Sequence, residues 1–240
     1  MSMEALKMIK RIAVIALMAV GVSSFAADAP KADALANIPE AKDYQLVYDL
    51  DLMKAARDIV YDADNTAKFT GKAFDRVAYF VELQPNEGEA QYVYVSMDAF
   101  TPDVTKIGVP TVASGNTFQQ PVANMNVVSN VKSIVAGTAL KSGNIEFWPT
   151  NYATGNAAKV PNADEATYDF GDVPQPGDYG SMQVHNNDAK QTLFSISHWV
   201  AGREADIGIG NAPSGNPDWT FSKNAQNIKS MRLRVLVHVK

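Results

Sequence analysis

The chain has 240 residues, a formal net charge of −5 and no cysteine. Without cysteine, the fold has no disulfide, no thiolate metal ligand and no cysteine nucleophile. The acidic balance and the lack of a basic stripe argue against nucleic acid as a partner, because proteins that bind nucleic acids neutralise phosphates with clustered Lys and Arg.

The N-terminus has the features of a secretory signal peptide. Three basic residues precede a short apolar run at residues 12–22, and a small-x-small cleavage pattern ends at Ala26. The run is about 11 residues long, whereas a helix that spans a bilayer needs about 20. We therefore expect a signal peptide at residues 1–26 and an exported mature chain, periplasmic or secreted, without a membrane span. Residues 27–43, rich in Ala, Asp and Pro, are expected to form a linker.

From Tyr44 onward, apolar and polar residues alternate as in half-buried strands. The expected strands are residues 44–52, 74–84, 91–100, 122–128, 133–136, 145–148, 167–170, 181–185, 192–199, 206–209 and 231–239. On the first of these, one face is expected to hold Tyr44, Leu46, Tyr48, Leu50 and Leu52. Residues 52–58 and 222–229 suit short helices. The pattern predicts an all-β fold: a single β-sandwich of jelly-roll type over residues 44–240, with one or two short helices.

The glycine-rich stretch at residues 207–221, IGIGNAPSGNPDWTF, is not a nucleotide loop. Pro213 stands where a G-x-G-x-x-G motif needs its third glycine, and neither a strand–helix context nor a P-loop lysine is present. We interpret the stretch as a stiffened turn between two strands. Whether Trp219 points into the core or towards a ligand stays open at this point.

Nucleophilic catalysis has weak support in the sequence. The nucleophile elbow G-x-S-x-G does not occur. His185, His198 and His238 lie in expected strands, where a histidine is more often a packed or surface residue than a catalytic base. His238 is on the polar face of the last strand and is expected at the surface.

Two groups of acidic residues are candidates for a cation site. Asp49, Asp51, Asp62 and Asp64 offer oxygen ligands for a structural calcium ion, although Ala67 and Ala73 stand where an EF-hand loop has Gly and Glu. The second group is Asp169, Asp172 and Asp178. Solvated surface acids are the alternative interpretation for both groups. No other cofactor is expected.

Aromatic residues lie in or beside loops rich in Asn, Asp and Gln. Sugar rings are bound by such surfaces, because an aromatic face takes the C–H face of the ring while amides and carboxylates bind its hydroxyls. The candidate ligand-binding residues are Trp148, Asn151, Tyr152, His185, Asn186, Trp199, Asn211, Asn216, Asp218 and Trp219. The alternative is that the tryptophans fill the ends of the sandwich.

Several segments carry a resemblance: AYFVELQ, YVYVSMDAFT, KIGVPT, GNIEFWPTNY, YGSMQVHN, QTLFSISHW and the stretch at residues 207–221. Together they resemble a domain of secreted proteins from planctomycete- and verrucomicrobia-type bacteria. That domain is linked by name or by fusion to sialate O-acetylesterases. The resemblance covers about residues 44–240 and implies a carbohydrate context more than catalysis. Esterases of the SGNH type have a Gly-Asp-Ser block and an Asp-x-x-His motif, whereas the Gly-Asp pairs here precede Val173 and Tyr179 and no Asp-x-x-His occurs.

Three hypotheses about function follow. The first is an exported, non-catalytic β-sandwich that binds glycans or assists a glycan-processing enzyme. The second is a carbohydrate (sialate) O-acetylesterase with an unrecognised Ser/His/Asp set. The third is a structural cell-surface protein without a small-molecule ligand.

Overall fold

The computed structural model describes residues 33–54, 59–111, 113–150, 152–153, 155–157, 159, 168–169, 173–174, 176, 180–198, 206–210 and 224–240. At residues 152, 153, 174, 198, 206, 224 and 225 it describes the backbone alone. The expected signal peptide at residues 1–26 lies outside the described residues.

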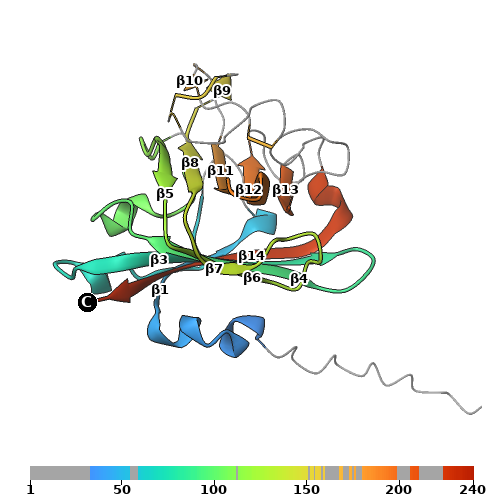
Figure 1. The fold of residues 1–240 in the computed structure, drawn as a ribbon, viewed down its shortest axis with the longest axis horizontal. Coiled ribbons are helices and arrows are strands. Elements are labelled where there is room, and N and C mark those ends of the chain that lie inside the picture. The colour runs from blue at the N-terminus through green and yellow to red at the C-terminus, as the bar shows by residue number, and fades with distance from the viewer. Residues whose placement is uncertain are drawn as a thin grey trace, which may run out of the picture. The chain divides into compact units, whose positions relative to one another are not determined.

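Two antiparallel sheets dominate the fold (Figure 1). Among the described residues, the first sheet has seven strands in the order β2-β1-β14-β3-β4-β6-β7, and the second has five in the order β13-β12-β11-β8-β5. The first sheet consists of β1 (Gln45–Asp51), β2 (Ala63–Asp64), β3 (Phe74–Pro85), β4 (Gln91–Asp98), β6 (Met125–Ser129), β7 (Gly137–Leu140) and β14 (Ile228–Val239). The second consists of β5 (Phe118–Val122), β8 (Gly143–Trp148), β11 (Gly180–Asn186), β12 (Gln191–His198) and β13 (Asp206–Ile209). A separate ribbon pairs β9 (Tyr152–Ala153) with β10 (Val173–Pro174). The expected all-β fold is confirmed.

The two sheets share one hydrophobic core. Alternate residues of the long strands β3 and β14 enter it, as the sequence pattern predicted, and the second sheet contributes Ile145, Phe147 and Phe194 among others. Tyr79 of β3 contacts the ring of Phe194 with centroids 5.9 Å apart, and its hydroxyl donates a hydrogen bond to the carbonyl of Ile107 at 2.9 Å. One face of each sheet is therefore committed to this core.

A β-bulge divides β1 between the two faces of the first sheet. The pairing of β1 with β14 slips between Leu46 and Tyr48. Tyr48 and Leu50 belong to the core between the sheets, whereas Tyr44 and Leu46 belong to a cluster on the opposite face. The expectation that all five apolar residues of this segment share one face is wrong, because an extra residue in a strand reverses the sidedness of the residues beyond it.

Several expected elements differ from the observed ones. Residues 122–128 hold the end of β5, a turn at Asn124 (φ 53°) and the start of β6. Residues 133–136 form turn and irregular backbone rather than a strand. β5 and β7 were not predicted: both are edge strands, and Pro121 in β5 is tolerated for that reason.

The expected helices are single turns. A 3-10 turn, η3 (Leu52–Lys54), begins the segment predicted as a helix at 52–58, of which residues 55–58 lie outside the described part. Near the C-terminus, η7 (Asn224–Asn227) is followed at once by β14, so the helix predicted at 222–229 gives way to a strand from Ile228.

A short N-terminal segment packs against the outer face of the first sheet. It contains two 3-10 turns, η1 (Ala34–Asn37) and η2 (Glu40–Asp43). Ile38 and Ala41 of this segment share a buried cluster with Phe80, Tyr94 and Leu236 of the sheet. From Asp33 onward, the stretch expected as a linker is thus part of the folded unit.

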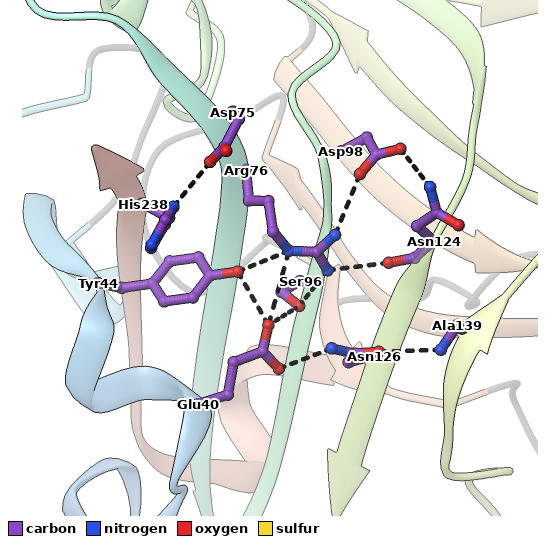
Figure 2. A network of polar contacts seen from close by, with 10 residues as sticks. All are labelled: Glu40, Tyr44, Asp75, Arg76, Ser96, Asp98, Asn124, Asn126, Ala139 and His238. Carbon is purple, nitrogen blue, oxygen red and sulfur yellow. Dashed lines mark hydrogen bonds and ion pairs between the residues drawn. The ribbon is translucent and has the colours of Figure 1, made fainter. Parts of the chain in front are cut away.

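The side chain of Glu40 binds this segment to the sheet through hydrogen bonds and an ion pair (Figure 2). Its Oε1 accepts hydrogen bonds from the hydroxyls of Ser96 at 2.6 Å and Tyr44 at 2.9 Å, and its Oε2 accepts one from Asn126 Nδ2 at 3.0 Å. Arg76 Nε lies 3.7 Å from Oε1 and donates to the Tyr44 hydroxyl at 2.8 Å. The carboxylate therefore joins η2 to β3, β4 and β6.

Candidate functional site

The second sheet has one apolar and one polar face. Ile145 and Phe147 of β8 enter the core, so alternation places Asn144, Glu146 and Trp148 on the opposite face. β11 follows the same rule. In β12 alternation places Ser195 and Ser197 on this face, and a register shift at Leu193, which is in the core like Phe194, brings Thr192 to it beside His185. We call the resulting set the polar face; its members are Asn144, Glu146, Trp148, Ser181, Gln183, His185, Thr192, Ser195 and Ser197.

The strand register arranges the polar face in three rows that cross β8, β11 and β12. The rows are Asn144–His185–Thr192, Glu146–Gln183–Ser195 and Trp148–Ser181–Ser197. The Ser181 and Ser197 hydroxyls lie 3.3 Å apart, which confirms that the third row is in contact. Each of the nine side chains is at most 1% exposed. Polar groups thus fill a closed layer rather than a wet surface.

Burial of such a layer lowers the stability of the fold unless its polar groups have hydrogen-bond partners. Each buried polar atom without a hydrogen bond destabilises a fold by about 1–3 kcal/mol. In the described part of the chain, Asn144 Oδ1 and Ser195 Oγ have no hydrogen-bond partner, and neither do the side-chain amide nitrogens of Asn186 and Asn187 beside the face. These four atoms have unused capacity to bind a polar ligand.

Three ligand-type side chains converge at one end of the polar face. Glu146, Asp169 and His185 each offer one atom within 4.8 Å of the others, and all three residues are buried. Glu146 Oε1 lies 3.8 Å from His185 Nε2. Among the described residues, this is the one group of three or more His, Cys, Asp or Glu side chains that meets so closely.

Neighbouring donors on β8 hold the Glu146 carboxylate. Asn144 Nδ2 donates to Oε1 at 3.1 Å, and Trp148 Nε1 donates to Oε2 at 2.9 Å. Both donors lie two residues from Glu146, hence on the same face of the strand. The carboxyl group is therefore fixed in orientation inside the protein.

The tautomer of His185 follows from its contact with Thr192. The Thr192 hydroxyl donates its single proton to the carbonyl of Tyr168 at 3.0 Å and lies 3.1 Å from His185 Nδ1. That hydroxyl must then accept from the ring, so Nδ1 carries a proton. Nε2 consequently faces Glu146. The Tyr168 ring meets the His185 ring edge-on, with centroids 6.0 Å apart.

The structure brings together part of the set predicted to bind a ligand. Trp148 and His185 lie on the polar face, and Asn186 ends the same strand β11. Trp148 is wholly buried and donates to Glu146, so here it is not an exposed platform. Tyr152 lies in β9, where the backbone alone is described. The predicted residues outside the described part are Asn151, Trp199, Asn211, Asn216, Asp218 and Trp219.

The sequence interpretation missed Glu146. It included Asp169 in a candidate cation group, with a solvated surface position as the alternative, and Asp169 is 1% exposed. The signal that identifies Glu146 is the alternation in GNIEFW, where polar residues at every second position mark a separate face. His238 is at the surface as predicted, with its Nδ1 2.7 Å from Asp75 Oδ1.

The four aspartates predicted to bind calcium lie near cations and local donors. Asp49 accepts from Arg232 Nε at 2.6 Å, and Lys54 lies 3.1 Å from Asp51 and 3.6 Å from Asp62. Asp64 accepts from the backbone and hydroxyl of Thr66 at its own turn. These contacts form a surface ion-pair network, and calcium binding there stays a prediction.

No family model, curated protein or solved structure matches this chain. In the described segments, no helix has the length and apolar character needed to cross a membrane.

Proposed function

We propose that this chain is an exported, non-catalytic β-sandwich of jelly-roll type that binds glycans, alone or as an accessory to a glycan-processing enzyme. The observation that supports this function is the polar face, with its amides, hydroxyls, carboxylate and indole in three rows. Sugars offer hydroxyls that both donate and accept, together with apolar C–H patches. The composition of the polar face complements both.

The Tyr168–Asp169 pair lies against the polar face. Tyr168 is held by its hydroxyl, which donates to Asn187 Oδ1 at 2.9 Å, and by its carbonyl, which accepts from Thr192. Each such hydrogen bond contributes about 1 kcal/mol net. A ligand that supplies equivalent partners offsets this loss, so we expect glycan binding to displace Tyr168.

The esterase alternative has less support from the geometry. Among the described residues, the hydroxyl in contact with His185 belongs to Thr192. Its proton is donated to a backbone carbonyl and its oxygen accepts from His185 Nδ1, the reverse of what activates a nucleophile. The binding function is therefore preferred.

A glycan array followed by calorimetry tests the proposal with the exported chain. We expect selective retention of a glycan class and roughly fivefold weaker binding in Ser195→Ala, because one hydrogen bond of about 1 kcal/mol is lost. Ser230→Ala, an exposed serine of β14, is the matched control and should bind like the wild type. Equal affinity in both variants, or no retained glycan, refutes the proposal. Acetate release from O-acetylated sugars would instead favour the esterase.

A further inference from the structure

We infer that Glu146, Asp169 and His185 form a binding site for one divalent cation. The three residues come from β8, from the segment at 168–169 and from β11, and their ligand atoms all lie within 4.8 Å of one another. Ligands about 2.1 Å from a tetrahedral ion lie roughly 3.4 Å apart. The 3.8 Å between Glu146 Oε1 and His185 Nε2 is close to that spacing, so a small inward shift brings both atoms onto one ion.

The orientation of the His185 ring supports this inference. Because Nδ1 contacts the Thr192 hydroxyl at 3.1 Å, the other ring nitrogen, Nε2, faces the Glu146 carboxylate. Metal-binding histidines commonly have this arrangement, in which the other ring nitrogen donates to an oxygen and so fixes the ring. Thr192 has that role here.

The surroundings of Glu146 supply a second, independent observation. The Asn144 amide that donates to Glu146 Oε1 carries an oxygen, Oδ1, that is buried and has no partner in the described part of the chain. Reversing the amide would bring this oxygen against the carboxylate, so the orientation is fixed by repulsion. A buried oxygen without a partner therefore belongs to a residue that contacts the cluster.

The ligand set defines the class of ion. One imidazole nitrogen with two carboxylates suits Zn²⁺ or Mn²⁺, whereas Ca²⁺ prefers six to eight oxygens. The ion would join Asp169 to β8 and β11 and thereby hold the Tyr168–Asp169 pair against the polar face. This site does not depend on glycan binding, and the metal alone tests it.

The experiment measures metal uptake by the full exported chain after removal of metals with a chelator. We expect one Zn²⁺ or Mn²⁺ per chain by elemental analysis and calorimetry, and little response to Ca²⁺. His185→Gln and Glu146→Gln should abolish this uptake. Thr192→Val removes the oxygen that contacts the ring and that donates to the Tyr168 carbonyl, and should weaken binding about 10- to 100-fold. His238→Gln is the matched control, since His238 is an equally ligating imidazole paired with Asp75 on the other sheet.

A measurement on the unaltered chain tests the inference even if a variant fails to fold. Addition of Co²⁺ should give visible absorption bands typical of nitrogen and oxygen ligation, and Zn²⁺ should displace them. Absence of uptake by the wild type overturns the inference. Uptake that persists in His185→Gln but disappears in His238→Gln overturns it as well.

Discussion

Replacing Glu40 with Gln tests how the N-terminal segment is held on the first sheet (Figure 2). The carboxylate accepts three hydrogen bonds, from Ser96, Tyr44 and Asn126, and lies 3.7 Å from Arg76. Glutamine keeps the shape but has one acceptor oxygen in place of two. If that oxygen retains the two hydroxyls, the new NH₂ group faces the Asn126 NH₂ group, donor against donor.

No rearrangement of the neighbouring side chains restores the lost hydrogen bond without breaking another one. Asn126 would have to reverse its amide to accept from the new NH₂ group, but its Oδ1 already accepts from the backbone of Ala139 at 2.9 Å. One hydrogen bond to a charged group is therefore lost, which is worth about 1.5–3 kcal/mol. The attraction to Arg76 is also lost, but solvent screens it because the Glu40 side chain is 27% exposed. We expect a loss of about 2 kcal/mol in the free energy of unfolding.

Urea unfolding followed by circular dichroism measures this loss, and thermal unfolding should show a decrease in Tm of roughly 4–8 °C for a chain of this size. Asp33→Asn is the matched control. Asp33 lies in the same segment and accepts from Arg234 Nη1 at 2.8 Å, but it is 48% exposed, so its loss should cost at most about 1 kcal/mol. An unfolding free energy for Glu40→Gln within about 0.5 kcal/mol of the wild type would refute the reasoning, since it falls below the worth of one hydrogen bond.

Two further predictions concern close packing and alkaline stability. Gly143→Ala should destabilise the fold or prevent folding, because the new Cβ would lie 2.6 Å from a backbone oxygen of β11. Gly137→Ala is the control, since its new Cβ would meet only the flexible end of a side chain. Similar melting temperatures for the two variants would contradict this prediction. Burial raises the pKa of the Tyr61 hydroxyl above its ordinary value of about 10, so the folded state favours the protonated form and loses stability as the pH rises beyond 10. Tyrosinate absorbance should therefore rise in two steps, the later one together with loss of near-UV dichroism, and complete ionisation of a chain that is still folded would argue against it.

The long strands of the first sheet could be predicted from the sequence because their pattern is local. Every second residue is apolar over residues 77–83 of β3 and 231–239 of β14, so sidedness and burial follow directly there. β1 shows the limit of this rule. Its bulge between Leu46 and Tyr48 depends on the pairing with β14, nearly the whole chain away, and no local pattern reveals it.

The candidate site was harder to predict for the same reason. Glu146 meets His185 only through the pairing of β8 with β11, and Asp169 joins them from a segment without regular structure. A single Glu in a short strand is normally a solvent-facing residue. Only the structure shows that both faces of this sheet are covered, and that the polar one is buried.

The contrast between the outer faces of the two sheets argues that the polar face has a chemical role. The first sheet covers its outer face by hydrophobic packing, with Phe80, Tyr94 and Leu236 under the N-terminal segment, and burial of such groups stabilises by about 25 cal/mol per Å². The second sheet buries its polar face, including Glu146 and His185, which gain nothing from leaving water. The polar groups on the outer face of the first sheet, Glu40, Arg76 and Ser96, are partners of one another, whereas the polar face holds buried atoms of Asn144 and Ser195 without a partner among the described residues. The polar ligand or cation that we propose would supply those partners, because both bind donors and acceptors that are held rigidly and kept away from water.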